Sequence, residues 1–151
     1  MVESIELIVL SFLASLGFAI VFQLRGKNLI IAAAGGAIVR TVYILLQMFI
    51  PYRILYAGLA AMAAAFFAEI IATKKKTPAT MFLYPSIIPL IPADLIYYTL
   101  GGLVLGEQDT FVNNGIECIL ALVGICIGFV VASTITVYVR RFAASSDAKE
   151  A

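Results

Sequence analysis

The sequence predicts an all-α integral membrane protein with about five transmembrane segments, the fourth of them broken by prolines. Of its 151 residues, 63% are hydrophobic and 13% are charged, whereas soluble domains average about half apolar and a quarter charged. The apolar residues also form long runs, each long enough to cross a bilayer as a helix. We expect residues 1–141 to form a single transmembrane domain and residues 142–151 a short cytoplasmic tail, of which residues 145–151, SSDAKEA, are expected to be disordered.

Five apolar runs give the expected spans. No basic residue precedes Arg25, so the first run lacks the basic start of a secretory signal and is expected to be a retained span. Two runs carry small residues four positions apart, a spacing that lets another helix approach closely. These pairs are Ser11 with Ser15 and Gly124 with Gly128. The expected spans cover residues 5–22, 29–49, 54–73, 81–105 and 115–139.

The placement of the basic residues predicts an orientation. Basic residues cluster at 25–27, at 74–76 and at 140–141, after the first, third and fifth spans. Because positive charges favour cytoplasmic loops, all three clusters are expected on the cytoplasmic side. We therefore predict a multi-pass protein of the plasma membrane with its N-terminus outside and its C-terminus in the cytoplasm.

The fourth run contains the most unusual stretch of the chain. Pro85, Pro89 and Pro92 interrupt a segment that is otherwise apolar, and each proline removes a backbone donor from a helix. Backbone groups freed in this way persist in a membrane only where protein or a wet cavity surrounds them. The three prolines therefore predict a broken element at a substrate site. Ser86 lies within it and is more simply a backbone-bonding serine than a nucleophile.

Four ionisable residues lie within or at the edges of the apolar runs: Arg40, Glu69, Asp94 and Glu117. Charges are costly there and usually face partners or a wet cavity, so all four are candidates for substrate binding or coupling. For Glu69 and Glu117 the alternative is a position near the membrane interface. For Arg40 it is a structural ion pair with a glutamate. Ala33, Gly36, Tyr43 and Gln47 share a helical face with Arg40.

Asp94 follows the last proline and precedes a plausible half-helix. As an N-cap it would accept backbone N–H bonds. In several transporters the N-terminus of such a half-helix points at an anionic substrate group. The exposed N–H groups could then hold the carboxylate of an amino acid, while Asp94, Glu69 or free carbonyls hold its ammonium. Capping alone is the simpler alternative, and the two roles can coexist.

Other function classes find little support in the residues. The chain has no histidine and two cysteines, Cys118 and Cys126, that lie eight positions apart in one run. On a helix that is about 12 Å, too far for a disulfide. We therefore predict no metal site, no cofactor and no enzymatic activity. The absence of a large basic cluster predicts no nucleic-acid binding.

Residues 68–98, AEIIATKKKTPATMFLYPSIIPLIPADLIYY, resemble the signature of the threonine/serine exporter family, and the whole chain is similar to that family's smaller, C-terminal half. The positions that match the pattern are Glu69, Thr77, Pro78, Pro85, Pro89, Leu90 and Pro92. Ala93 and Asp94 depart from it, because the pattern has glycine and then a smaller residue there.

The resemblance implies secondary export of threonine, serine or similar small amino acids, coupled to protons, by a complex with a larger membrane subunit. We expect Glu69 or Asp94 to take up the coupling proton, because a carboxylate withdrawn from water holds a proton more readily. Two alternatives stay open. The chain could be a non-transporting structural subunit of a two-chain complex, or it could be a channel lined by Tyr43, Gln47 and Asp94.

Overall fold

The structure, a computed structural model, describes residues 2–150 and the side chains of residues 3–139. Within that range the chain is helical and contains no strand. The helices are α1 (Val2–Val21), α2 (Lys27–Phe49), α3 (Arg53–Lys75), α4 (Thr80–Ile87), the 3-10 turn η1 (Ile88–Leu90), α5 (Ala93–Leu105) and α6 (Gln108–Glu150).

The spans agree with the sequence prediction. Among the described residues, α1, α2, α3 and α6 are each long and apolar enough to cross a membrane. The segments Thr80–Leu90 and Ala93–Leu105 pass the same test together and are bent by 48° at their junction. The chain is therefore an all-α membrane protein with four continuous spans and one broken span, the fourth, as the prolines predicted.

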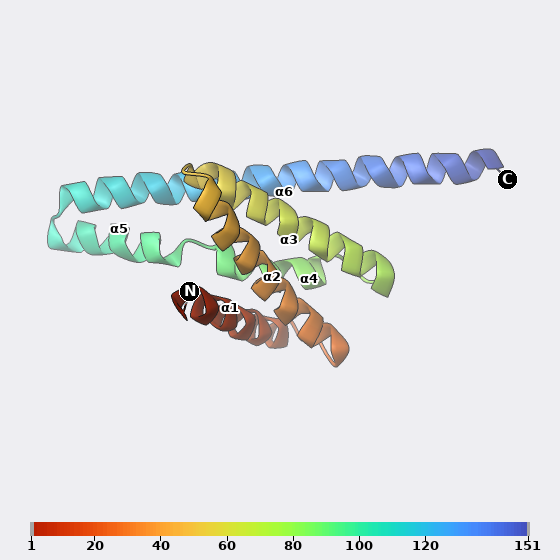
Figure 1. The fold of residues 1–151 in the computed structure, drawn as a ribbon, viewed down its shortest axis with the longest axis horizontal. Coiled ribbons are helices and arrows are strands. Elements are labelled where there is room, and N and C mark those ends of the chain that lie inside the picture. Colours follow the sequence, from red (N-terminus) through yellow and green to blue (C-terminus); the bar gives the residue numbers. More distant parts are fainter. Residues whose placement is uncertain (1, 151) are drawn as a thin grey trace.

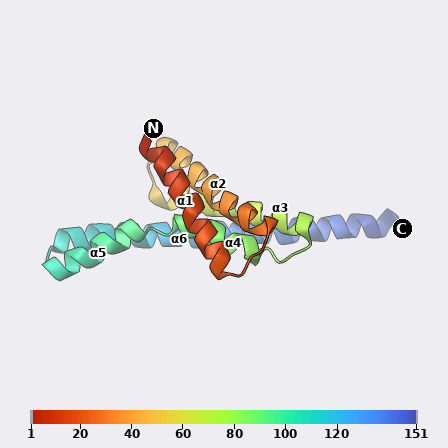
Figure 2. The ribbon, with the colours of Figure 1, turned by 90° about the horizontal axis from the view of Figure 1, so that it is seen from below.

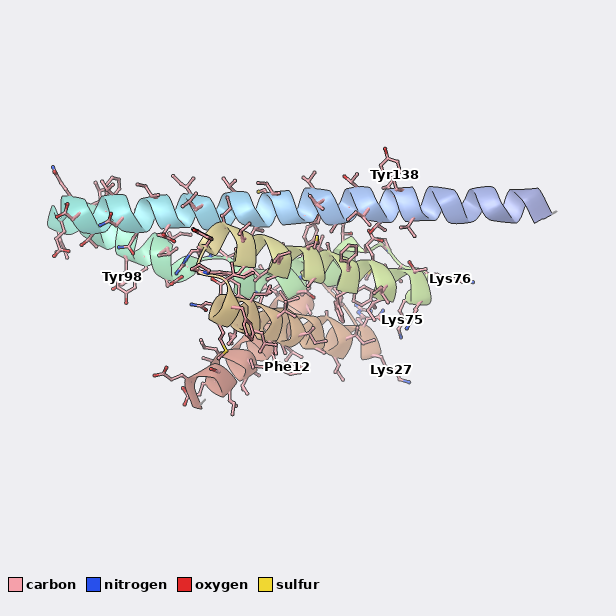
Figure 3. The ribbon with its side chains drawn as sticks, turned by 45° about the horizontal axis from the view of Figure 1, so that its top comes forward. Phe12, Lys27, Lys75, Lys76, Tyr98 and Tyr138 are labelled. Atoms are coloured by element: carbon pink, nitrogen blue, oxygen red, sulfur yellow. The ribbon has the colours of Figure 1, made fainter. Side chains whose placement is uncertain are left out.

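The helices form a bundle with a projecting hairpin. Helices α1 to α4 pack together, and α6 runs along α3 (Figure 1). Helix α5 leaves the bundle and lies alongside the first part of α6, with which it forms a hairpin (Figures 1 and 2). Lys27, Lys75 and Lys76 lie at the same end of the bundle, which we call the lysine end (Figure 3).

Small residues set the helix contacts at the centre of the bundle. One face of α3 is almost entirely alanine and is buried. Gly128 of α6 meets the backbone of Gly58 of α3 so closely that an added methyl group would overlap the carbonyl oxygen of Gly58. Gly36 of α2 meets the side chain of Ser15 of α1, and an added methyl group there would overlap the Ser15 hydroxyl. Both pairs of small residues identified in the sequence are therefore confirmed as helix contacts.

Two boundaries differ from the prediction. Gly106, at φ 74°, ends α5 in the left-handed conformation that glycine favours, and α6 begins at once at Gln108 rather than near residue 115. The polar residues there form the start of a helix, where such residues bond well: Thr110 donates to the Glu107 carboxylate at 3.0 Å. Helix α6 also continues to Glu150, through the predicted tail and over residues 145–150, where the sequence predicted disorder.

The break itself follows from its three prolines. Pro85 lies inside α4, Pro89 lies in η1, and Pro92 is the residue before α5. None of them can donate a backbone hydrogen bond, so the α-helix tightens into a 3-10 turn. The chain is then extended at Ile91 before α5 begins.

Candidate functional site

The broken span opens onto a cavity of about 430 Å³, which we call the break pocket. That volume lies within the range of small-molecule sites, about 300–1,000 Å³. Its walls come from the start of α1, one face of α2, the start of α3, and the break with the first turn of α5. The residues that line it are Leu7, Arg40, Tyr43, Gln47, Arg53, Leu90, Ile91, Pro92, Ala93 and Asp94.

Two contacts hold the side chain of Arg40 in the break pocket. Its Nη1 donates to the carbonyl oxygen of Pro89 in η1, at a long 3.4 Å. Its guanidinium carbon lies 5.1 Å from the centre of the Tyr43 ring, a favourable cation–π distance. Its Nε is buried and has no hydrogen-bond partner among the described residues. The arginine is thus held in place but keeps donor capacity for a further group.

Asp94 brings a negative charge to the same pocket. The structure corrects its expected role as an N-cap: α5 begins at Ala93, Pro92 occupies the N-cap position, and no side chain caps the helix. The chain leaves its extended conformation directly after Pro92, so Asp94 falls in the first turn instead. Its carboxylate is exposed and is favoured there by the positive end of the helix dipole.

Glu117, another of the four charged candidates, pairs with Arg53 and not with Arg40. Glu117 of α6 forms an ion pair with Arg53, with 3.3 Å between Oε2 and Nε, and the two side chains are 50% and 23% exposed. Arg53 lines the break pocket and Glu117 does not. Helix α6 therefore holds an arginine at the pocket wall, a contribution that the sequence analysis missed. The sequence signal for this contribution was Arg53 itself, the only charged residue in the short turn between the second and third spans.

Glu69 does not line the break pocket. It is 16 residues beyond Arg53 on the same helix, which is about 24 Å along the axis. There it lines a second polar cavity of about 390 Å³, which we call the lysine-end pocket. The structure therefore does not bring Glu69 and Asp94 to one site. The lysine-end pocket is lined by Glu69, Ala72, Thr73, Lys76, Thr77, Pro78 and Ala79.

Of the remaining predicted site residues, some are buried in the core and others lie at the break pocket. Pro85 and Ser86 are fully buried, and Ser86 Oγ donates to the carbonyl oxygen of Phe82 at 2.7 Å. The backbone-bonding role expected for Ser86 is confirmed. Pro92 lines the break pocket, and Pro89 contributes through its carbonyl oxygen. The sequence had placed Tyr43 and Gln47 on the face of Arg40, and both line this pocket.

The arrangement favours binding of a small molecule that carries both charges. Arg40 and Arg53 offer donors for an anionic group, Asp94 offers an acceptor for a cationic one, and Tyr43 and Gln47 are polar neighbours. In the part of the chain that the structure describes, no group of three or more His, Cys, Asp or Glu side chains could hold a metal ion.

A family model described as "Threonine/Serine exporter, ThrE" matches residues 7–135. Comparison with curated proteins and with solved structures gives no match. The matched range contains every residue that lines either pocket.

Proposed function

Because the chain belongs to the threonine/serine exporter family, we propose that the break pocket is its substrate site and that it binds threonine, serine or a similar small amino acid. Membership of that family makes the chain a transporter of the exporter type. Beyond this membership, we propose which residues form the substrate site, what each of them binds, which ion drives transport and that a second subunit takes part.

The position of Arg40 carries the proposal. An arginine inside an apolar span is costly unless a partner or a wet cavity receives it. Here the protein supplies one long hydrogen bond and one aromatic face and leaves Nε without a partner among the described residues. A substrate carboxylate would complete this arrangement, because a guanidinium binds a carboxylate with parallel, charge-assisted hydrogen bonds.

The part of the break pocket formed by α5 can bind the ammonium end of an amino acid. Asp94 can accept hydrogen bonds from the substrate ammonium, and the first turn of α5 presents backbone N–H groups next to it. Gln47 and Tyr43 can bond a side-chain hydroxyl. Recognition of that hydroxyl would favour serine and threonine over alanine, since polar groups left unpaired in a site penalise the analogue that lacks it.

We further propose that transport is export driven by protons and that this chain works with a larger membrane subunit. Asp94 and Glu69 are the candidates for the coupling proton. The proposed orientation, with the lysine end in the cytoplasm, is supported by Lys27, Lys75 and Lys76 lying together there (Figure 3). The second subunit is part of the proposal because the chain resembles the smaller, C-terminal half of the threonine/serine exporter family.

The test compares two aspartates in matched positions. Asp94 and Asp109 each lie in the first turn of a helix and are exposed, but only Asp94 lines the break pocket. This chain and the larger subunit are reconstituted in proteoliposomes, each alone and both together, and transport of labelled serine is followed with and without an imposed pH gradient. We expect Asp94→Asn to raise the KM for serine about ten- to a hundred-fold, as the loss of one charge-assisted hydrogen bond predicts.

Asp109→Asn should transport like the unaltered protein. Loss of the response to the pH gradient in Asp94→Asn alone would identify Asp94 as the proton acceptor, and loss in Glu69→Gln alone would identify Glu69. Undiminished serine transport by Asp94→Asn would refute the proposed site. Full transport by the larger subunit without this chain would show that the chain has a structural role only.

A further inference from the structure

We infer that the lysine-end pocket is a second binding site for a small zwitterionic amino acid, separate from the break pocket. Within the proposed function it is the site that loads substrate from the cytoplasm, so this inference rests on that function for its direction. Its cavity of about 390 Å³ is close in size to the break pocket and is also lined by side chains of both charges.

An unpartnered polar atom marks the lysine-end pocket, as another marks the break pocket. Among the described residues, three buried side-chain polar atoms lack a hydrogen-bond partner: Ser15 Oγ, Arg40 Nε and Thr77 Oγ1. Ser15 lies against Gly36 in the contact between α1 and α2 and lines neither pocket. The other two each line a polar pocket. Since buried polar groups are nearly always bonded, a ligand hydroxyl or carboxylate at Thr77 would satisfy the hydroxyl.

The backbone holds Thr77 in this position. Helix α3 ends at Lys75, and Lys76 adopts the left-handed conformation at φ 53° with its N–H donating to the carbonyl oxygen of Ala72. The N–H of Thr77 donates to the same oxygen at 3.1 Å. The pocket is thus formed by a bonded helix end, followed by the rigid φ of Pro78.

The charges around Thr77 complement an amino acid. The Glu69 carboxylate can accept hydrogen bonds from a substrate ammonium, and the Lys76 ammonium can donate to a substrate carboxylate. The hydroxyl of Thr77, the residue after Lys76 in the pocket wall, can bond the hydroxyl of serine, so all three polar groups of serine find a counterpart. The break pocket offers the same set through Asp94, its arginines, and Gln47.

The two pockets are too far apart to be one site. They share no lining residue, and they lie near opposite ends of α3. Arg53 and Thr73 are 20 residues apart on that helix, or about 30 Å, which is the thickness of the hydrocarbon core of a bilayer. A molecule bound at the lysine-end pocket is therefore at the membrane face opposite the break pocket.

The test uses a pair of threonines of similar burial. Thr77→Val removes the unpartnered hydroxyl and keeps the side-chain shape. Thr41→Val is the control, because Thr41 is also partly buried, donates to Ala37 within its own helix and lines neither pocket. Binding of L-serine to the purified exporter is measured by calorimetry, and transport of labelled serine is measured from each side of the membrane in oriented vesicles.

We expect the unaltered protein and Thr41→Val to bind serine at two sites, and Thr77→Val and Glu69→Gln to lose one. In transport, Thr77→Val should raise the KM about ten-fold for serine supplied at the lysine end, with the KM for serine supplied from the other side unchanged. Single-site binding by the unaltered protein, or an unchanged KM at the lysine end in both variants, would overturn the inference. Either result leaves the proposed function standing if Asp94→Asn still raises the KM for serine, so the two proposals fail separately.

Discussion

The two polar pockets of this chain are built in different ways. The break pocket depends on packing: it needs a span broken by prolines, an arginine from α2 and a second arginine held by α6. The lysine-end pocket is local: its lining comes from one continuous stretch of sequence, the end of α3 and the turn that follows. A site assembled from several helices can change shape when they move, whereas a helix end keeps its hydrogen bonds. This contrast fits a site that releases substrate and a site that receives it.

The largest effect is expected from a change that reaches both pockets at once. Helix α3 contributes to both and is held against α6 by the contact between Gly58 and Gly128. Gly128→Ala should lower the free energy of unfolding by about 1–3 kcal/mol, the usual cost of overpacking, and should reduce serine binding at both pockets together. Thermal unfolding in detergent and calorimetry measure the two effects.

The control for that change is Gly17→Ala. An added methyl group at Gly17 meets nothing within 4 Å, and alanine is the better helix former by about 1 kcal/mol. Gly17→Ala should therefore leave stability unchanged or raise it. Equal stability of the two variants would show that the contact between α3 and α6 does not hold the pockets in place.

The next effect separates the two pockets. Arg40→Met removes the charge from the break pocket and keeps most of the side-chain length. Loss of hydrogen bonds to a charged group, at about 1.5–3 kcal/mol, should weaken serine binding there about ten- to a hundred-fold. Binding at the lysine-end pocket should stay the same.

Arg25→Met is its control, since Arg25 is exposed between α1 and α2 and lines neither pocket. Calorimetric titration of both variants with serine gives the comparison. If Arg40→Met weakened binding at both pockets equally, they would not be independent sites.

The smallest effect concerns the ion pair at the wall of the break pocket. Because Arg53 and Glu117 are partly exposed, their pairing should contribute no more than about 1 kcal/mol to stability. A double-mutant cycle with Arg53→Gln and Glu117→Gln measures it by thermal unfolding. Transport should distinguish the partners: Arg53→Gln should raise the KM for serine several-fold, whereas Glu117→Gln should change it less, since Glu117 lies outside the pocket. A larger effect of Glu117→Gln would mean that placing Arg53 matters more than its charge.

Several features of the fold could be predicted from the sequence because they depend on neighbouring residues. The length of an apolar run sets a membrane span, and a proline removes a hydrogen bond wherever it lies. The four continuous spans, the break at Pro85 to Pro92 and the small-residue contacts were therefore predictable. The start of α6 at Gln108 could not be predicted, because a polar stretch is equally typical of a loop and of the first turn of a helix.

The sequence by itself determined which residues carry charge into the apolar spans, and it placed Arg40, Tyr43 and Gln47 on one helical face. Only the tertiary structure decided which charges meet. Arg40 and Asp94, 54 residues apart, share a pocket because the bend after η1 turns the chain past α2. Glu69 and Asp94 are closer in sequence, yet they lie in separate pockets because the rest of α3, its turn and α4 carry the chain between them. Helical periodicity fixes the face a side chain occupies, but the packing of the helices fixes what that face meets.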